Sequence, residues 1–423
     1  MNCSLKESTY EEIKSYYDSV LNVDKSLFKT SNDEPTPISC VEEMIAKIPE
    51  YCFEQSTAKW LDPCCGNGNF HIVILQKLLK YHSLEHILTN MLYFNDTNEQ
   101  RLNVVKTIFC NNTYKLNITQ LDFLENNYIE QFDFIVANPP YAKLLPNGKR
   151  ASKNHNLIGS FLTKSFNILA ENGMLLFITP DNWMSFADRN TIISIITSKQ
   201  ILHLDIHTAK RYFKKIGSSF TWYLVENKPA YKPVTISGIW KRELYTSIVE
   251  SYTRDFIPLY YTDVVDSIFR KTVQAQNKKF NIETSSDLHK YTKRNLIVDK
   301  PDDIHIYPLI HTPNTTVYAS RPHKYQDGYK VFISTTSYYS TFVDNVGMTQ
   351  SIAFIRCSSE EEANNIKKIL DHPLYRFINN ICRWGNFNNI RILQHFPVCN
   401  NYESVYEQFN ITSQEKEVIE KYA

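Results

Sequence analysis

The chain has 423 residues, of which 43% are hydrophobic and 22% charged, a balance typical of a globular protein with more than one domain. Its formal net charge of +1 excludes a uniformly basic coat for nucleic acid, so any such contact must rest on local clusters of cations. No apolar run approaches the roughly 20 residues that cross a bilayer, the N-terminus does not resemble a signal peptide, and the 9 cysteines form no C-x-x-C pair. We therefore expect an intracellular protein with reduced thiols, no membrane contact and no metal site.

Short apolar runs alternate with helical segments through the first half of the chain. In chain order, the pattern predicts helices over 8–23 and 38–49, a strand ending at 61, a helix over 70–79, a strand over 91–94, a helix over 101–109, a strand over 132–137, a helix over 158–169, a strand over 174–178, a helix over 192–196, and strands over 201–206 and 219–225. This alternation indicates a mostly parallel sheet covered on both faces. Ligands bind such sheets beyond the carboxyl ends of the strands.

The alternation fades after about residue 230. Residues 231–423 combine short strands at 331–333 and 352–355 with helices over 359–370 and 373–383. We therefore expect two domains: an α/β, Rossmann-like domain over 1–230 and an α+β domain over 231–423.

A glycine-containing turn follows the first strand, with the sequence Asp62-Pro63-Cys64-Cys65-Gly66-Asn67-Gly68-Asn69-Phe70. Gly66 and Gly68 favour a tight turn that a ligand can approach closely, and the helix that starts there offers free N–H groups. The third glycine of a dinucleotide-binding motif is missing, which disfavours an NAD site. A purely structural turn remains the alternative.

Acidic residues end the next two strands. Asp96 is placed to accept hydrogen bonds from ribose hydroxyls, and Asp122 with Phe123 could bind and stack on an adenine ring. The alternatives are an N-cap role for Asp96, and a turn aspartate beside a core phenylalanine for Asp122 and Phe123.

The sequence Asn138-Pro139-Pro140-Tyr141 follows the buried strand at 132–137. The two prolines stiffen the chain and remove two N–H donors. The exocyclic nitrogen of adenine is a poor nucleophile because its lone pair is delocalised into the ring. The Asn138 side-chain oxygen and the Pro139 carbonyl could accept both amino hydrogens and free that lone pair, while Tyr141 stacks on the base.

These motifs resemble those of the N6-adenine-specific DNA methyltransferases of restriction–modification systems. The likeness covers residues 30–225 well and the remainder weakly. It implies S-adenosylmethionine as the cofactor. Because the segment Thr36-Pro37 precedes the glycine turn, it also implies the gamma order of motifs, with a C-terminal target recognition domain. The cofactor-binding residues that it implies are Thr36, Pro37, Asp62, Cys64, Gly66, Gly68, Asp96, Asp122, Phe123 and Asn138.

The resemblance also implies a site-specific enzyme that methylates a flipped adenine in double-stranded DNA. Its catalytic residues would be Asn138, Pro139, Pro140, Tyr141 and Phe213, with Tyr212 as the alternative stacking ring and a core phenylalanine as the alternative reading of Phe213. We expect a monomer, with a separately encoded restriction endonuclease as a possible partner. Methylation of an RNA base or of a glutamine amide, and an inert DNA-binding module, are the competing functions.

Two basic clusters could contact DNA phosphates next to the catalytic turn. They comprise Lys149, Arg150 and Lys153, and Lys214 and Lys215. A merely solvated loop is the alternative for the first cluster. In the C-terminal half, Arg383 and Asn386 could read base edges, since Arg suits guanine and Asn suits adenine in the major groove.

Overall fold

A computed structural model describes the chain over residues 4–423, except 6, 25, 27–33, 110–112, 143–156, 188–189, 214–218, 251–254 and 337. The chain divides into two compact units. The first comprises Met1–Trp183 and Asn190–Arg254, and the second Met184–Arg189 and Asp255–Ala423. The expected boundary at residue 230 is therefore too early.

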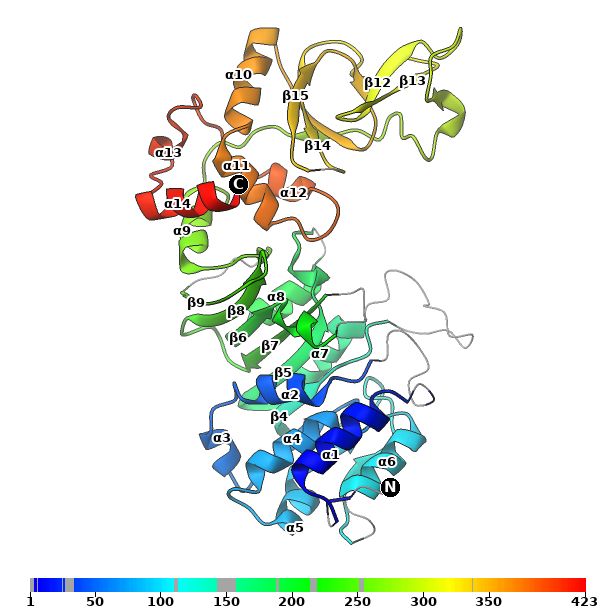
Figure 1. Ribbon diagram of the computed structural model, residues 1–423, viewed down its shortest axis with the longest axis vertical. Coiled ribbons are helices and arrows are strands. Elements are labelled where there is room, and N and C mark those ends of the chain that lie inside the picture. The colour runs from blue at the N-terminus through cyan, green and yellow to red at the C-terminus, as the bar shows by residue number, and fades with distance from the viewer. Residues whose placement is uncertain are drawn as a thin grey trace. The chain divides into compact units, whose positions relative to one another are not determined.

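The first unit is built on a nine-stranded sheet with the order β3-β2-β1-β4-β5-β7-β6-β8-β9 (Figure 1). Its strands are β1 (Trp60–Asp62), β2 (Leu92–Asn95), β3 (Asn117–Thr119), β4 (Phe132–Ala137), β5 (Leu169–Pro180), β6 (Gln200–Ile206), β7 (Phe220–Glu226), β8 (Val234–Trp240) and β9 (Glu243–Val249). The first five are mutually parallel, and β7 lies antiparallel between β5 and β6. This is the expected α/β Rossmann-like fold, and the predicted strand over 132–137 coincides with β4.

Helices pack around this sheet (Figure 1). One face carries Trp60, Phe134 and Trp222, and it shares a hydrophobic core with residues of α1, α2, α4 and α6. On the other side, α7 contacts β5 and α8 contacts β6. The helical segments are α1 (Tyr10–Tyr16), the π-helical η1 (Tyr17–Leu21), α2 (Ile38–Ile45), α3 (Tyr51–Glu54), α4 (Asn69–Leu78), α5 (Leu84–His86), η2 (Ile87–Met91), α6 (Glu99–Phe109), α7 (Leu157–Ile168), η3 (Asn182–Met184), α8 (Thr191–Thr197) and η4 (Thr208–Arg211).

The strands β8 and β9 account for the shifted domain boundary. They form an antiparallel hairpin, and β8 joins the sheet by pairing parallel to β6. Leu244 and Ile248 of β9 are each 62% exposed, so this edge strand lacks the strong apolar signature of the inner strands. The hairpin therefore belongs to the sheet of the first unit and not to the second domain.

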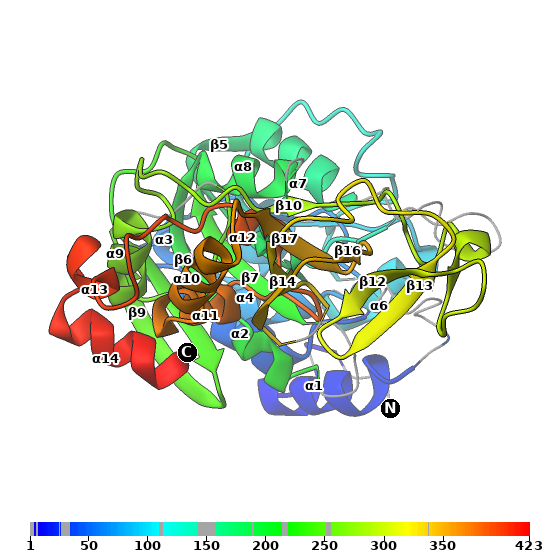
Figure 2. The same ribbon diagram turned by 90° about the horizontal axis from the view of Figure 1, so that it is seen from above.

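The second unit contains two four-stranded sheets, ordered β10-β17-β14-β15 and β11-β13-β12-β16 (Figure 2). α10 packs against β14 and β15, and α11 packs against α14. The unit is α+β, as expected, and none of the described helices is long and apolar enough to span a membrane. Its elements are α9 (Asp263–Lys271), β10 (Glu283–Thr284), η5 (Arg294–Leu296), β11 (Ile297–Val298), β12 (Tyr307–Thr312), β13 (Thr315–Ala319), β14 (Lys330–Ser334), β15 (Thr341–Asp344), β16 (Gly347–Met348), β17 (Ile352–Arg356), α10 (Glu360–Leu370), α11 (Pro373–Ile381), α12 (Ile390–Leu393), α13 (Val405–Gln408) and α14 (Ser413–Tyr422).

Candidate active site

The glycine turn leads from β1 into α4. Gly66 and Gly68 have φ angles of 55° and 86°, in the left-handed region that favours glycine. A Cβ on Gly68 would lie 2.8 Å from the Phe109 ring, so this position also has no room for a side chain. The turn is braced from a distant segment, because the buried Tyr17 hydroxyl donates to the Asn67 carbonyl oxygen at 2.6 Å. The sequence thus builds a fixed, narrow turn at the carboxyl end of β1.

Two buried carboxylates hold the peptide groups of this turn. Asp62 accepts the Cys64 N–H at 3.0 Å, and Asp96 accepts the Gly66 N–H at 2.9 Å. Burial raises the pKa of Asp62, with a further contribution from the Asp96 charge, while the Cys64 N–H opposes the rise. Nη1 of Arg101, a residue of α6, lies 3.8 Å from Asp96 Oδ2 and places a positive charge beside this carboxylate. Both carboxylates therefore shape the turn in this structure.

Asn138 stands at the end of β4 and is fixed by the segment before α2. Its Nδ2 donates to the Glu34 carbonyl oxygen at 2.9 Å and to the Thr36 hydroxyl at 3.1 Å. Thr36 is also connected to the glycine turn, because its carbonyl oxygen accepts from Asn69 Nδ2 at 2.8 Å. Since Nδ2 is occupied in this way, the orientation of the Asn138 oxygen is set.

Tyr141 completes the rigid turn after Asn138. Pro139 is buried and Pro140 exposed, and the Tyr141 hydroxyl donates to Asn138 Oδ1 at 2.5 Å. Burial raises the pKa of this hydroxyl, which keeps it protonated and able to donate. A carbonyl oxygen has two lone pairs, so Asn138 Oδ1 retains one acceptor position after receiving this hydrogen bond.

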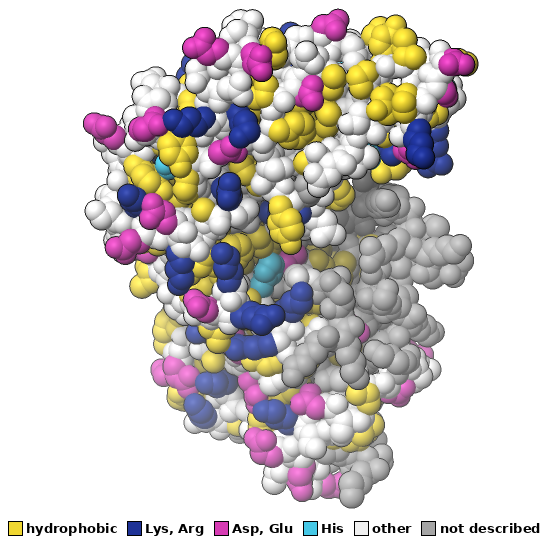
Figure 3. Space-filling model, turned by 45° about the horizontal axis from the view of Figure 1, so that its top comes forward, with side chains coloured by type: hydrophobic (Ala, Val, Ile, Leu, Met, Phe, Trp, Pro, Cys, Tyr) yellow, Lys and Arg dark blue, Asp and Glu magenta, His cyan; other side chains and the backbone are white. Residues whose placement is uncertain are grey.

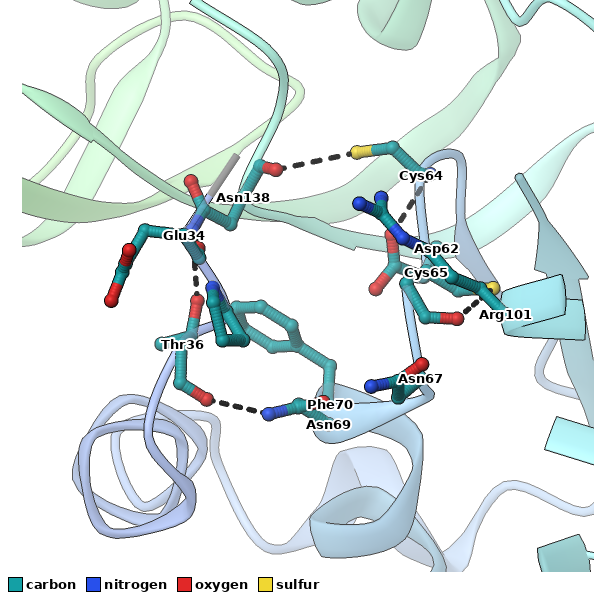
Figure 4. A pocket seen from close by; sticks show the side chains of 12 residues that line it. Glu34, Thr36, Asp62, Cys64, Cys65, Asn67, Asn69, Phe70, Arg101 and Asn138 are labelled. Carbon is teal, nitrogen blue, oxygen red and sulfur yellow. Dashed lines mark hydrogen bonds between the residues drawn. The ribbon is translucent and has the colours of Figure 1, made fainter. Parts of the chain in front are cut away.

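A pocket lies between these two groups of residues (Figure 4). Glu34, Thr36 and Asn138 are on one side of the view, and Asp62, Cys64, Cys65 and Arg101 on the other, with Asn67, Asn69 and Phe70 along the base. The structure thus brings together five of the predicted site residues: Thr36, Asp62, Cys64, Gly66 and Asn138. Asp96 joins them through its hydrogen bond to Gly66.

Other predicted residues lie elsewhere. Pro37 is the N-cap of α2. Asp122 is exposed and accepts the Leu124 N–H at 2.9 Å, whereas Phe123 is buried with its ring 5.2 Å from that of Phe161. Neither Asp122 nor Phe123 lines the pocket described above, and both match the alternative of a turn aspartate beside a core ring.

Phe213, the ring expected to stack on the base, packs against another aromatic side chain. Phe213 is buried, and its ring centroid lies 4.5 Å from that of Phe220, which is 6.0 Å from that of Tyr141. Tyr212 is half-buried and donates its hydroxyl to Glu43. The ring of Phe213 thus belongs to an aromatic cluster that reaches Tyr141, and its catalytic role stays a prediction. The basic residues expected to contact DNA, Lys149, Arg150, Lys153, Lys214 and Lys215, lie outside the described residues.

Two pocket residues carry no clear signal in the sequence. Arg101 looks like an ordinary polar residue of α6, yet it is 8% exposed and lines the pocket. Asn67 sits between the two glycines, is 1% exposed, and neither atom of its amide has a hydrogen-bond partner among the described residues. A buried amide without a partner costs free energy, so a polar ligand in the pocket would relieve that cost.

Comparison with known proteins agrees with this geometry. Residues 43–213 match the Eco57I restriction-modification methylase family. The chain is also 28% identical over 182 residues to the Type II methyltransferase M.VspI of Vibrio sp. (strain 343), a match that spans 40% of this chain and 42% of that relative.

Residues 43–213 form a methyltransferase domain of the restriction–modification type. The cofactor of such a domain is S-adenosylmethionine. The Gly66–Gly68 turn of this methyltransferase domain and the adjoining carboxylates fit a polar ligand of that kind. So does the Asn67 side-chain amide, for which the described residues offer no hydrogen-bond partner.

Solved structures extend the likeness in fold beyond that domain. The DrdV–DNA complex is similar with a TM-score of 0.56 at 11% identity, covering 98% of this chain and 59% of that one. The Type IIL restriction-modification enzyme MmeI, solved with DNA, is similar with a TM-score of 0.52 at 12% identity, covering 88% of this chain and 66% of that one. The chain thus spans less than two thirds of each of these proteins, and such low identities relate the folds alone.

Proposed function

We propose that the protein transfers a methyl group from S-adenosylmethionine to the exocyclic N6 of adenine in double-stranded DNA. The observation that carries this proposal is the position of Asn138, which belongs to the pocket through its side chain and to the Asn-Pro-Pro-Tyr turn through its place in the chain. A methyl donor in the pocket and an amino group held at the turn would meet at this residue.

The chain's own residues would hold the base and orient its nitrogen. Asn138 Oδ1, fixed through the hydrogen bonds of Nδ2, would accept one amino hydrogen, and the Pro139 carbonyl the other. Tyr141 would stack on the ring, with Phe220 and Phe213 behind it. Positioning of this kind lowers the barrier without a charged general base.

The cofactor would be held on the other side of Asn138. Asp62 offers a carboxylate, Gly66 a backbone without a side chain and Arg101 a cation. Asn67 offers a side-chain amide that has no hydrogen-bond partner in the described part of the chain. When bound, S-adenosylmethionine would supply a methyl group on a sulfonium: the C–S bond breaks as the C–N bond forms, the sulfur leaves as a neutral thioether, and the base nitrogen loses one proton to solvent. Gly68 gives the turn its shape by leaving room for Phe109.

The base must leave the duplex to reach Asn138, at a cost of a few kcal/mol that contacts to the flanking DNA must offset. We assign target recognition to the second unit, because an enzyme that methylates a protein amide would not need a second unit of this size. We further propose that the protein acts inside the cell as a monomer, with a separately encoded restriction endonuclease as partner.

Methyl transfer from labelled cofactor tests the proposal. Duplex DNA, RNA and a glutamine-containing peptide are offered in turn, and digested DNA is analysed by mass spectrometry for N6-methyladenine. We expect label in adenine of duplex DNA, its loss in Asn138→Ala, and calorimetric cofactor binding that is nearly unchanged in that variant. Label in cytosine, RNA or the peptide would contradict the substrate assignment. Loss of both activity and cofactor binding would mean that Asn138 has a different role.

A further inference from the structure

Two loops of the second unit end in exposed aromatic side chains. Tyr338, between β14 and β15, is 84% exposed, and Phe387, between α11 and α12, is 66% exposed. Their exposure is selective, because the neighbouring Tyr339 is buried and donates its hydroxyl to the Leu370 carbonyl oxygen at 2.9 Å. Figure 3 shows hydrophobic side chains at the surface together with both basic and acidic residues. Burying an aromatic ring is favourable, so a ligand that covers both of these rings would gain free energy from the contact.

The two loops are joined by one buried side chain. Asn388 Nδ2 donates to the Ser334 carbonyl oxygen at 2.7 Å, and its backbone N–H donates to that of Thr335 at 2.9 Å. Asn388 Oδ1 accepts from Asn379 Nδ2 at 3.1 Å, and both asparagines are buried. The residue beside Phe387 is therefore tied to the start of the loop that carries Tyr338, which holds the two loops next to each other.

Arg383 connects the same two loops. Its guanidinium lies 5.3 Å from the centre of the Tyr338 ring, and Nη2 donates to the Asn386 carbonyl oxygen at 2.9 Å. Gly385, with a φ of 130°, turns the chain between these residues, and the Trp384 indole anchors it by donating to the Ile257 carbonyl oxygen at 2.8 Å. The guanidinium is thereby held next to a ring.

The charge of the two loops favours a nucleic acid over a protein partner. Residues 335–340 contain no charged residue, and residues 382–389 contain Arg383 but no carboxylate. Aromatic rings stack on bases of any sequence, and arginine binds both base edges and phosphates. An acidic residue in these loops would repel the phosphate backbone.

We propose that Tyr338, Arg383 and Phe387 form the surface through which the second unit binds duplex DNA. The rings pack against bases or sugars at the target, and Arg383 donates to a base edge or a phosphate. This inference rests on the proposed function, since it takes DNA as the substrate. It assigns the recognition contacts to three named side chains.

The test compares alanine variants of these residues with matched controls in the full chain. The controls are Tyr291→Ala, at a tyrosine of the same unit that is 58% exposed, and Arg376→Ala, at an exposed arginine of α11. Single-turnover methylation of sheared, unmethylated genomic DNA is measured at subsaturating DNA, with cofactor binding by calorimetry and thermal denaturation alongside. We expect Tyr338→Ala, Arg383→Ala and Phe387→Ala each to lower the rate by about tenfold, whereas Tyr338→Phe and Phe387→Tyr retain it. Cofactor binding should stay constant.

The outcomes separate this inference from the proposed function. If the unaltered protein methylates DNA but the three variants behave like the two controls, the surface is not the DNA contact. If the unaltered protein methylates no DNA, both proposals fail together. If the variants methylate normally but change the oligomeric state in size-exclusion chromatography, the surface binds a second copy of the chain, which also overturns the inference.

Discussion

Asn138 and Thr36 are 102 positions apart in the chain, yet the amide of one donates to the hydroxyl of the other at 3.1 Å. The same threonine accepts Asn69 Nδ2 through its carbonyl oxygen. A single residue thus couples the turn at the end of β4 to the start of α4. Both halves of the proposed site depend on this coupling, and it can be tested by point substitution.

Thr36→Val keeps the shape of the side chain but removes the acceptor for Asn138 Nδ2. We expect the single-turnover rate to fall by about tenfold, because Asn138 Nδ2 loses one of its two acceptors and the side chain is less firmly oriented. Thr36→Ser restores the hydroxyl and is the control, with a rate close to that of the unaltered protein. An effect confined to cofactor affinity would place Thr36 in binding and not in orienting Asn138.

Two substitutions at Tyr141 separate the contribution of its ring from that of its hydroxyl. Tyr141→Phe removes the hydrogen bond to Asn138 Oδ1 but keeps the ring near Phe220, so most activity should remain. Tyr141→Ala removes the stacking surface, and we expect a fall of about 10- to 100-fold in kcat/KM for DNA. Equal losses in the two variants, measured by initial rates, would assign the role to the hydroxyl.

The two glycines of the turn should respond differently to alanine. At Gly66 a Cβ meets no atom within 4 Å, so Gly66→Ala adds only the cost of a left-handed φ, roughly 1 kcal/mol. At Gly68 the added Cβ also meets the Phe109 ring at 2.8 Å. We therefore expect a clearly larger drop in Tm for Gly68→Ala than for Gly66→Ala in thermal denaturation. Equal drops would mean that the Phe109 ring moves aside without cost.

The stability of the protein should depend on Asp205 of β6. Burial raises the pKa of this carboxyl to about 7, assisted by Glu43 and opposed by Thr208 and Ala209. Because the folded pKa is above the unfolded one, the stabilisation is fully present below the ordinary aspartate pKa and is lost as pH rises to about 7. The free energy of unfolding should fall by up to roughly 1.4 kcal/mol per pH unit in that window.

Urea denaturation between pH 4 and 7 measures this slope. Asp205→Asn keeps one acceptor oxygen, for the Thr208 hydroxyl or the Ala209 N–H but not for both, and cannot ionise. Its stability should therefore be lower overall but vary less with pH. Identical slopes for the variant and the unaltered protein would show that other buried acids, such as Asp62, dominate.

Local patterns in the sequence predict most of the first unit. The strand over 132–137, the helix over 70–79 and the helix over 158–169 correspond to β4, α4 and α7, because their apolar residues are spaced as those elements require. The β8–β9 hairpin is missed although β8 alternates between buried and half-buried residues, because β9 exposes Glu243 and Leu244 and buries only Val249. The structure explains Gly238 in β8, where a Cβ would overlap the Tyr245 ring of β9, but the sequence alone does not show this contact.

The site is predicted less completely than the fold. Asp62, Gly66 and Asn138 line the pocket as expected, because motif and strand end coincide at each of them, whereas Thr36 is expected only from the family resemblance. Arg101 is missed, since whether a helical arginine faces a pocket or solvent depends on how its helix packs. The same ambiguity affects Phe123, whose neighbourhood is equally compatible with a pocket wall and with the core in which it lies.

The hydrogen bond from Tyr17 to the peptide between the two glycines has a thermodynamic consequence. It joins η1 and the turn over a separation of 50 residues, so ordering one favours ordering of the other. A ligand that binds the ordered turn also stabilises the segments whose order depends on the turn. Cofactor should therefore slow amide hydrogen exchange in α1 and η1, at the remote end of that bond, and Tyr17→Phe should abolish this protection while leaving the chain folded.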